Sequence, residues 1–387
     1  MREGDGATST HLRRIACVLG APPTARTLAG GDRHEFEVWQ RWAARPDVEM
    51  HVIACWTGAQ LAENLGYHLP LMLTESRASG IGALRLGYIA RCLRALRRLP
   101  EVGHLDAVYA GSPFFYDVLP AVAAKIQGRT KRIIVPFYHV TPPPTNRTGN
   151  PLANLLAWIE QRVMLRLIAR YADVVLVAYA GARDDLIRNG IAPTAIVTTG
   201  MGARAGLAAK APPQFDAICI GRLTPAKGII DLLDAWAILR RAVPAARLAL
   251  VGGEMPGFDV AREIQRHSLA PAVQIFIGPS DDEVRELMSA SRTFITASKE
   301  EGYGLAVGEA LAAGLPCITF DVPAFAAVFP LGRHTARGTS AEALAQAIRE
   351  VLTDEALYRR LHDEACSWRY SSWDEVADEL WCECVEA

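Results

Sequence analysis

The stretch SKEEGYGLAVGEALAAG, residues 298–314, combines two patterns that together indicate a strand–loop–helix unit. It follows an apolar run, Thr293–Ala297, that is typical of a buried strand, and it ends in an Ala- and Leu-rich run that is typical of a packed helix. Open parallel sheets bind ligands at the carboxyl ends of their strands, and a helix N-terminus favours phosphate. Gly302 and Gly304 leave the backbone open to close approach. The stretch therefore predicts a phosphate site at the start of this helix.

Two carboxylates, Glu301 and Glu309, flank the predicted helix start. Eight residues of helix rise about 12 Å, which is comparable to the length of a sugar diphosphate. A diphosphate at the amides around Gly304 and Leu305 would leave one carboxylate near each end of the ligand, where carboxylates accept hydrogen bonds from hydroxyls. This layout fits a nucleotide-sugar. The alternative interpretation is that Glu301 is solvated and Glu309 is a surface or capping acid.

A second motif, IGRLTPAKG at residues 220–228, follows the first strand-like run of the second half of the chain. It places Arg222 and Lys227 in a strand-to-helix loop, with Pro225 suited to an early helix position. Two cations beside a helix start can neutralise a leaving diphosphate without metal. Either cation alone could be a solvated surface charge. Because both motifs lie at strand ends of the same predicted domain, their pairing favours a site for a diphosphate.

Short apolar runs recur along the chain, each followed by a turn and a helix-like segment. Strands that are apolar throughout and alternate with helices indicate parallel sheets covered on both faces, so we predict an α/β chain of two Rossmann-like domains. The domains are predicted at 1–205 and 206–367, with 368–387 as a C-terminal helix and the Gly-, Ala- and Pro-rich stretch 200–213 as linker. The predicted strands are Ile15–Leu19, His51–Trp56, Ala107–Ala110, Arg132–His139, Asp173–Tyr179, Ala195–Thr199, Ala217–Ile220, Arg247–Val251, Val273–Ile277, Thr293–Ala297 and Pro316–Phe320.

The C-terminal stretch SWDEVADELW predicts a helix. Its apolar residues Trp373, Val376, Leu380 and Trp381 recur at near-helical spacing. The stretch begins with Ser372, and a glutamate follows three residues later, as in a capping box. A helix with two tryptophans on one face is expected to bury that face against another part of the protein. One interpretation is docking on the second domain, and the other is a crossing back to the first domain.

The composition is that of a globular chain, and its 387 residues are long for one core. Residues 1–204 contain 24 Lys and Arg against 16 Asp and Glu, a charge of +8, whereas the remainder contains 17 against 26, a charge of −9. A basic half joined to an acidic half suggests two domains with different partners. Attraction of the two halves across a cleft is equally compatible with these charges.

The cysteines bear on the compartment of the protein. Eight are scattered along the chain, none in a C-x-x-C pair, which favours a reduced, cytoplasmic protein. The N-terminus lacks the long apolar segment of a signal peptide. No uninterrupted apolar run reaches about 18 residues, so no membrane span is predicted.

With G-R-L-x-x-x-K-G followed by E-G-Y-G-L-x-x-x-E-A, the chain resembles the retaining glycosyltransferases of family 4, which have the GT-B fold. The resemblance is strong from about Asp216 to Asp321 and includes the E-x7-E pair. It implies two Rossmann-like domains with parallel sheets facing across a cleft, and a last helix, in 368–387, that crosses back to the first domain. It also implies transfer of a sugar from a nucleotide-diphosphate donor to an acceptor hydroxyl with retained anomeric configuration. We expect no cofactor and no metal, because no motif is dedicated to Mg²⁺ and the two cations can do that work.

The resemblance implies a role for each motif residue. Arg222 and Lys227 would contact the donor diphosphate, and Glu301 would hold a hydroxyl of the transferred sugar. The amides from Tyr303 to Ala306 would meet the phosphates, and Gly278–Glu283 would form the base pocket. Glu309 would hold the ribose. The expected donor-binding residues of the second domain are Gly278, Gly302, Tyr303, Gly304, Leu305 and Glu309.

The first domain is expected to carry the acceptor, a glycan, a lipid-linked molecule or a small molecule. Gly30 and Gly31 follow strand one as a flexible loop that family members place beside the donor and acceptor, and Asp32 with Glu35 has the pattern of a helix cap. His139 ends a predicted strand, at the place where family 4 enzymes commonly have a cleft histidine near the sugar. A structural role for this histidine is the alternative.

A basic segment, residues 83–99, carries five arginines and no acid. A basic amphipathic helix can lie on an anionic membrane, which would imply peripheral contact at the inner face of the membrane and a lipid-linked acceptor. The other interpretation is an ordinary packed helix with a solvated basic face. The arginines are Arg85, Arg91, Arg94, Arg97 and Arg98, and the apolar residues that can share a face are Leu86, Ile89, Leu93 and Leu96.

Two rival functions share this fold. A nucleotide-sugar epimerase needs no acceptor, and a non-catalytic nucleotide-sugar-binding protein shows no turnover. A dinucleotide-dependent oxidoreductase is disfavoured, because no G-x-G-x-x-G follows strand one. Nucleic acid is not an expected partner, because the basic half lacks interleaved aromatic residues.

Overall fold

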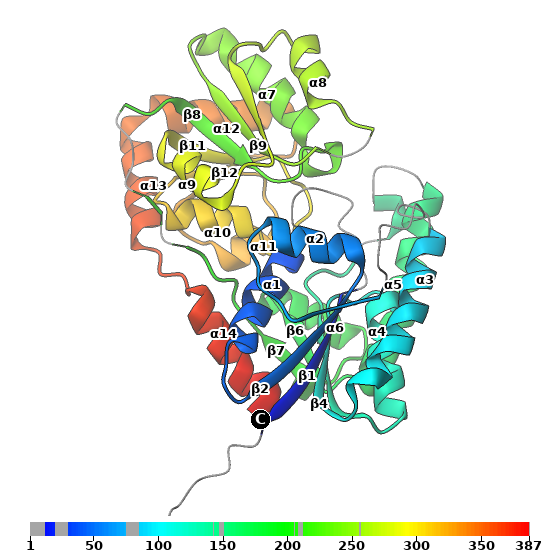
Figure 1. The fold of residues 1–387 in the computed structure, drawn as a ribbon. Helices are drawn as coiled ribbons and strands as arrows, with labels where there is room; N and C mark the ends of the chain where they lie inside the picture. Colours follow the sequence, from blue (N-terminus) through cyan, green and yellow to red (C-terminus); the bar gives the residue numbers. More distant parts are fainter. Residues whose placement is uncertain are drawn as a thin grey trace, which may run out of the picture.

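The computed structural model describes residues 12–19, 30–74, 85–141, 143–146, 151–204, 206–207, 212–254 and 257–386. Two parallel β-sheets are stacked one above the other, each with helices around it (Figure 1). The prediction of two Rossmann-like domains with parallel sheets is confirmed. None of the described helices combines the length and apolarity needed to cross a bilayer.

The first sheet has seven strands in the order β3-β2-β1-β4-β5-β6-β7, and the described pairings are all parallel. Its central strands are buried on both faces because helices cover both sides. Helices α3, α4, α5 and α6 pack on one face, and α1 and α2 pack on the other. The strands are β1 (Arg13–Leu19), β2 (Val48–Ala54), β3 (Leu71–Leu73), β4 (Leu105–Ala110), β5 (Thr130–Pro136), β6 (Val174–Val177) and β7 (Ile196–Thr198). The helices are α1 (Gly30–Ala43), α2 (Trp56–Asn64), α3 (Arg85–Arg98), α4 (Phe115–Ile126), α5 (Pro151–Tyr171) and α6 (Ala180–Arg188).

The second sheet has six strands in the order β10-β9-β8-β11-β12-β13. The strand order reverses at β8, so the loops after β8 and β11 flank a switch point where a ligand can bind. The strands are β8 (Phe215–Ile220), β9 (Leu248–Gly252), β10 (Val273–Ile277), β11 (Ser291–Thr296), β12 (Cys317–Thr319) and β13 (Arg333–Thr335). The helices are α7 (Ile229–Ala242), α8 (Val260–Arg266), α9 (Asp281–Ser289), α10 (Leu305–Ala312), α11 (Pro323–Val328), α12 (Ala341–Thr353) and α13 (Glu355–Ser367).

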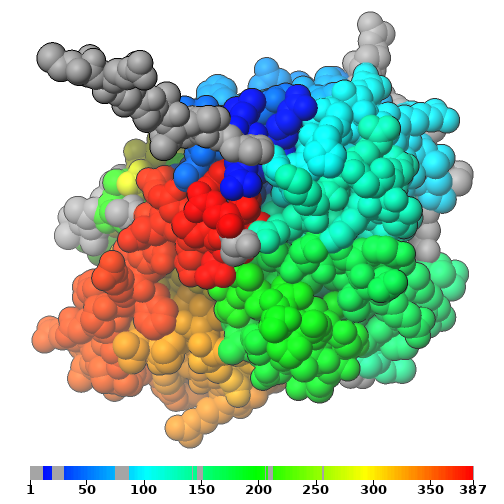
Figure 2. All heavy atoms as spheres, turned by 90° about the horizontal axis from the view of Figure 1, so that it is seen from below, coloured from blue at the N-terminus to red at the C-terminus, as the bar shows by residue number. Residues whose placement is uncertain are grey.

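The last helix, α14 (Trp373–Trp381), packs on α1 of the first domain. Ser372 caps it, and both hydrogen bonds of the capping box with Glu375 are present. The indole Nε1 of Trp42 in α1 donates to the carbonyl of Ala377 at 2.8 Å. Seen from below, the red C-terminal segment lies against the blue beginning of the first domain (Figure 2). The crossing joins the two domains at a second place besides the linker.

The strand predictions differ from the structure at the sheet edges and at several strand ends; the strand predicted at His51–Trp56, for example, is Val48–Ala54. Strands β3 and β13 were not predicted, because each is a short edge strand of three residues and β13 reads Arg-His-Thr. The strand predicted to end at His139 ends at Pro136, and His139 lies in the loop beyond it. Of the predicted linker, residues 205 and 208–211 lie outside the described residues. The domain boundaries at 205 and 367 therefore stay predictions.

Candidate functional site

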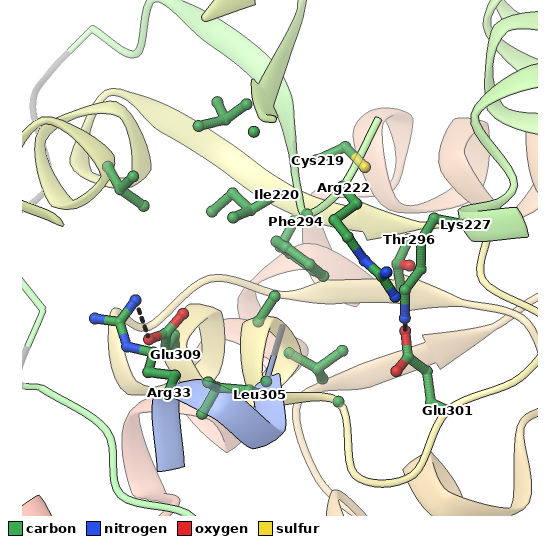
Figure 3. A pocket seen from close by; sticks show the side chains of 18 of the residues that line it. Arg33, Cys219, Ile220, Arg222, Lys227, Phe294, Thr296, Glu301, Leu305 and Glu309 are labelled. Atoms are coloured by element: carbon green, nitrogen blue, oxygen red, sulfur yellow. Dashed lines mark hydrogen bonds and ion pairs between the residues drawn. The ribbon is translucent and has the colours of Figure 1, made fainter. Parts of the chain in front are cut away.

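A pocket opens where the loops after β8 and β11 meet the start of α10 (Figure 3). It contains about 1380 Å³ of empty space, part of which is open to solvent. Eight of the twelve predicted site residues line it, and four do not. The lining residues among them are Gly30, Arg222, Lys227, Gly278, Glu301, Gly304, Leu305 and Glu309.

The cations at one end of the pocket come from the loop after β8. The hydroxyl of Thr224 accepts a hydrogen bond from the backbone N–H of Lys227, which fixes a short turn before α7. The Lys227 ammonium pairs with Glu301 at 2.5 Å. Arg222 is exposed and extends toward the same end of the pocket (Figure 3). Positive charge and a carboxylate therefore meet where the sequence predicted the diphosphate and the sugar.

The N-terminus of α10 faces the middle of the pocket, since Leu305 and Ala306 line it. Gly304 is the N-cap of this helix with φ 98°, and a Cβ there would lie 2.4 Å from the Phe325 ring, so only glycine fits. The first N–H groups of a helix have no intrahelical partner. The local geometry therefore presents N–H donors to an anion in the pocket.

Glu309 lies at the other end of the pocket, one turn further along α10. Arg33 of α1 approaches it, with 3.7 Å between a guanidinium nitrogen and the carboxylate. The same guanidinium pairs with Asp281 at the start of α9 at 2.5 Å. Burial raises the pKa of the Glu309 carboxyl, and the Arg33 cation opposes that rise. The two acids of the E-x7-E motif thus lie at opposite ends of one pocket, each beside a cation.

Four predicted site residues do not line the pocket, and three of them, His139, Gly302 and Tyr303, lie where the two domains touch. His139 pairs through Nε2 with Glu300 of the facing domain. Gly302 lies against the loop that follows β5, where a Cβ would be 2.7 Å from the carbonyl oxygen of Tyr138. The Tyr303 ring packs in a small core between the domains with Trp373. Gly31 lies beside the Tyr138 ring.

Two predictions for the first domain are wrong. Gly30 and Gly31 are the first residues of α1, so they are not in a flexible loop. Glu35 does not cap this helix. It is fully buried in it, and its carboxylate accepts hydrogen bonds from the hydroxyls of Tyr109 and Tyr138, each at 3.2 Å. These tyrosines lie far away in the sequence, so the local pattern could not indicate them.

Sequence reasoning missed Arg33 as a pocket residue. A lone arginine after a glycine pair carries no recognisable signal, and its partners lie in the other domain. Asp281 was inside the predicted base pocket, but its pairing with Arg33 was not anticipated. Within the described ranges, the structure has no cluster of three or more His, Cys, Asp or Glu side chains that could hold a metal ion.

Comparisons with solved structures identify the architecture. The structure of Anabaena HepE in complex with UDP and glucose superposes with a TM-score of 0.71, covering 96% of this chain and 98% of that chain at 16% identity. Sucrose-phosphate synthase from Thermosynechococcus elongatus gives a TM-score of 0.74, with 95% and 97% covered at 16% identity. The fold is GT-B.

Sequence comparisons give a more specific match for the second domain of this GT-B chain. Residues 208–368 match the family model described as glycosyl transferases group 1, a segment that contains every strand of the second sheet. The chain is similar to a GDP-mannose:cellobiosyl-diphosphopolyprenol alpha-mannosyltransferase from Xanthomonas oryzae pv. oryzae, with 28% identity over 257 residues. That match spans 64% of this chain and 64% of the relative. The serotype-specific mannosyltransferase WbdA from Escherichia coli is 32% identical over 246 residues, which are 56% of this chain and 30% of WbdA.

Proposed function

We propose that this protein is a glycosyltransferase that moves a sugar from a nucleotide-diphosphate donor to an acceptor hydroxyl with retention of anomeric configuration. One observation carries the proposal: Arg222, Lys227, the start of α10 and both acids of the E-x7-E motif line a single pocket. The group 1 match of residues 208–368 supports it. The mannosyltransferase relatives, which match over part of their length, also support it.

The pocket suggests how the donor would lie. Its diphosphate would meet the first amides of α10, with Arg222 and Lys227 compensating the charge that develops as the sugar–phosphate bond breaks. The Lys227 ammonium would shift from Glu301 to the phosphate, and the freed carboxylate would accept a sugar hydroxyl. Glu309 would hold the ribose at the far end.

The attack is proposed to occur on the same face as the departing diphosphate. The pocket carboxylates, Glu301 and Glu309, are assigned to hydroxyls, so we propose no enzymic nucleophile. A phosphate oxygen would take the proton of the acceptor hydroxyl. His139 is proposed to lie near the sugar, held by Glu300 from the facing domain. We also propose that no metal is needed, because cations and helix amides already compensate the diphosphate charge.

GDP-mannose is the first donor to test, and a lipid-linked diphosphate the first acceptor, because the relative from Xanthomonas oryzae is named for both. Thermal shifts would be measured with GDP, UDP, ADP and dTDP and their common sugars, on the parent and on Glu309→Ala. We expect stabilisation by one nucleotide and its loss in the variant. Turnover would then be followed with and without EDTA, with the anomeric configuration of the product read by NMR.

The results of this experiment separate the alternatives. Conversion of the donor sugar without acceptor would indicate an epimerase, and a thermal shift without any turnover would indicate a binding protein. An inverted product would contradict retention, and loss of turnover with EDTA would contradict a metal-free reaction. No shift with any nucleotide-sugar would contradict the proposed function.

We further propose that the first domain docks on an anionic membrane surface. Helix α3 exposes Ile89 (48%) and Leu93 (51%) together with the basic Arg97, and no acid lies within it. Arg91 does not contribute to this surface, because it is buried with its guanidinium over the Tyr88 ring. Helices α3 and α5 both pack on α4 (Figure 1). The large apolar residues that α5 exposes are Leu152, Leu155, Leu156, Ile159 and Val163.

Charge reversal of Arg97 and Arg98 to glutamate is expected to weaken binding to phosphatidylglycerol vesicles by at least about tenfold, since each basic residue near an anionic surface contributes roughly 1 kcal/mol. Co-sedimentation at low and high salt measures the effect. The matched control reverses Arg359 and Arg360 on α13 of the second domain, which are also exposed, and should bind like the parent. A parent protein that does not sediment with vesicles would contradict the proposal.

A further inference from the structure

Arg33 brings a cation from the first domain into the pocket of the second domain. It lies in the first turns of α1, its side chain is 18% exposed, and it lines the pocket. Figure 3 shows it joined to Glu309, at the opposite end of the pocket from the Lys227–Glu301 pair. Arg33 is not part of the two sequence motifs, residues 220–228 and 298–314, from which the donor site was predicted.

The two partners of Arg33 are held differently. Its contact with Asp281, at 2.5 Å, has the geometry of a direct hydrogen bond. Its contact with Glu309, at 3.7 Å, is too long for a hydrogen bond and is an ion pair. The positive charge of Arg33 therefore stabilises the Glu309 carboxylate, while the lone pairs of the carboxylate remain available to hydroxyl donors. Arg204 also pairs with Asp281, at 3.3 Å, which helps to fix the carboxylate that orients Arg33.

The protonation state of Glu309 determines how many hydrogen bonds its carboxyl group can accept from a ligand. An ionised carboxylate accepts hydrogen bonds from both hydroxyls of a ribose, whereas a protonated carboxyl has lost part of that capacity. Burial favours the protonated form, and Arg33 is the largest opposing influence among the charged groups that face Glu309. Those groups are Arg33, Asp281, Arg204 and Glu37.

We propose that Arg33 is a positioning residue of the donor site: through its ion pair with Glu309 across the domain boundary, it places that carboxylate to accept hydrogen bonds from the ribose hydroxyls of the nucleotide. This inference rests on the proposed function. Since Arg33 belongs to the first domain and Glu309 to the second, tight nucleotide binding requires the two domains to be in contact. The domain expected to bind the acceptor thus contributes to affinity for the donor.

The test compares a nucleoside diphosphate with its 2′,3′-dideoxy analogue by calorimetry, using the parent, Arg33→Ala and Arg33→Gln. In the parent, loss of the hydroxyls should weaken binding at least tenfold, as expected for hydrogen bonds to a charged group. In both variants the normal nucleotide should bind about tenfold more weakly, whereas the dideoxy analogue should bind almost as in the parent. The Gln variant keeps most of the side-chain volume, which guards against misfolding.

A second test measures nucleotide affinity as a function of pH. This pH dependence would not change if Arg33 had a purely structural role. Without the Arg33 cation, the pKa of Glu309 rises further, so the loss of nucleotide affinity on acidification should begin at a higher pH than in the parent. Arg45→Ala is the matched control, because it removes a first-domain arginine that pairs with Asp378 on α14, away from the pocket.

Two negative results can be told apart. If the parent binds the nucleotide and Arg33→Ala still loses affinity tenfold when the hydroxyls are removed, the inference about Arg33 is overturned and the proposed function stands. If the parent binds no nucleoside diphosphate at all, both are overturned.

Discussion

Replacing Lys227 by alanine is expected to lower kcat/KM for sugar transfer by about 10²- to 10³-fold, the usual cost of removing one group that stabilises charge in a transition state. The ammonium lies in the pocket beside Glu301, within reach of a departing diphosphate. Its removal also leaves the Glu301 carboxylate unpaired, and that negative charge would repel the leaving group. Steady-state kinetics with the identified donor measure the loss.

Lys299→Ala is the control for this experiment. Lys299 lies in the neighbouring loop after β11, but it is 48% exposed and pairs with Asp231 at 2.8 Å, outside the pocket lining. We expect the kcat/KM of the Lys299→Ala variant to stay within about twofold of the parent value, since exposed ion pairs contribute little. Equal rates for Lys227→Ala and the parent, with unchanged melting temperatures, would refute the assignment of Lys227 to the leaving group.

Replacing Trp381 by alanine is expected to lower the free energy of unfolding by about 3–5 kcal/mol, the range for truncating a large buried aromatic residue. Trp381 is fully buried against the first domain, where its ring meets Trp42 edge to face with 5.5 Å between centroids. The Arg45 guanidinium lies 4.5 Å from the centroid of the ring, and Nε1 donates to Glu386. The variant therefore loses the main anchor of α14 on α1. Urea unfolding followed by circular dichroism measures the change.

Glu379→Ala provides the comparison on the same helix. Its side chain is exposed, so its free energy of unfolding should stay within about 0.5 kcal/mol of the parent. A Trp381→Ala variant as stable as Glu379→Ala would show that the crossing helix contributes little to the first domain.

The features of this protein that depend on neighbours along the chain could be predicted from the sequence alone. Apolar runs alternating with helical segments predicted the two parallel sheets, because a strand covered on both faces must be apolar throughout. The motifs around Lys227 and Glu301 could be placed at strand ends for the same reason, and their pocket follows from the switch point of a parallel sheet. The capping box of α14 is likewise a signal confined to four residues.

The contacts between residues that are distant in the sequence could be seen only in the folded chain. Arg33 pairs with Asp281, Glu35 accepts hydrogen bonds from two tyrosines, and His139 pairs with Glu300. None of these pairings leaves a periodic or spaced pattern in the sequence. The same holds for the side of α3 that faces outward, where Ile89 and Leu93 are exposed although their spacing resembles that of a buried face. Local sequence patterns indicate which face of a helix or strand is buried. Contacts between domains depend instead on the shape and charge of two surfaces that form only when each domain has folded.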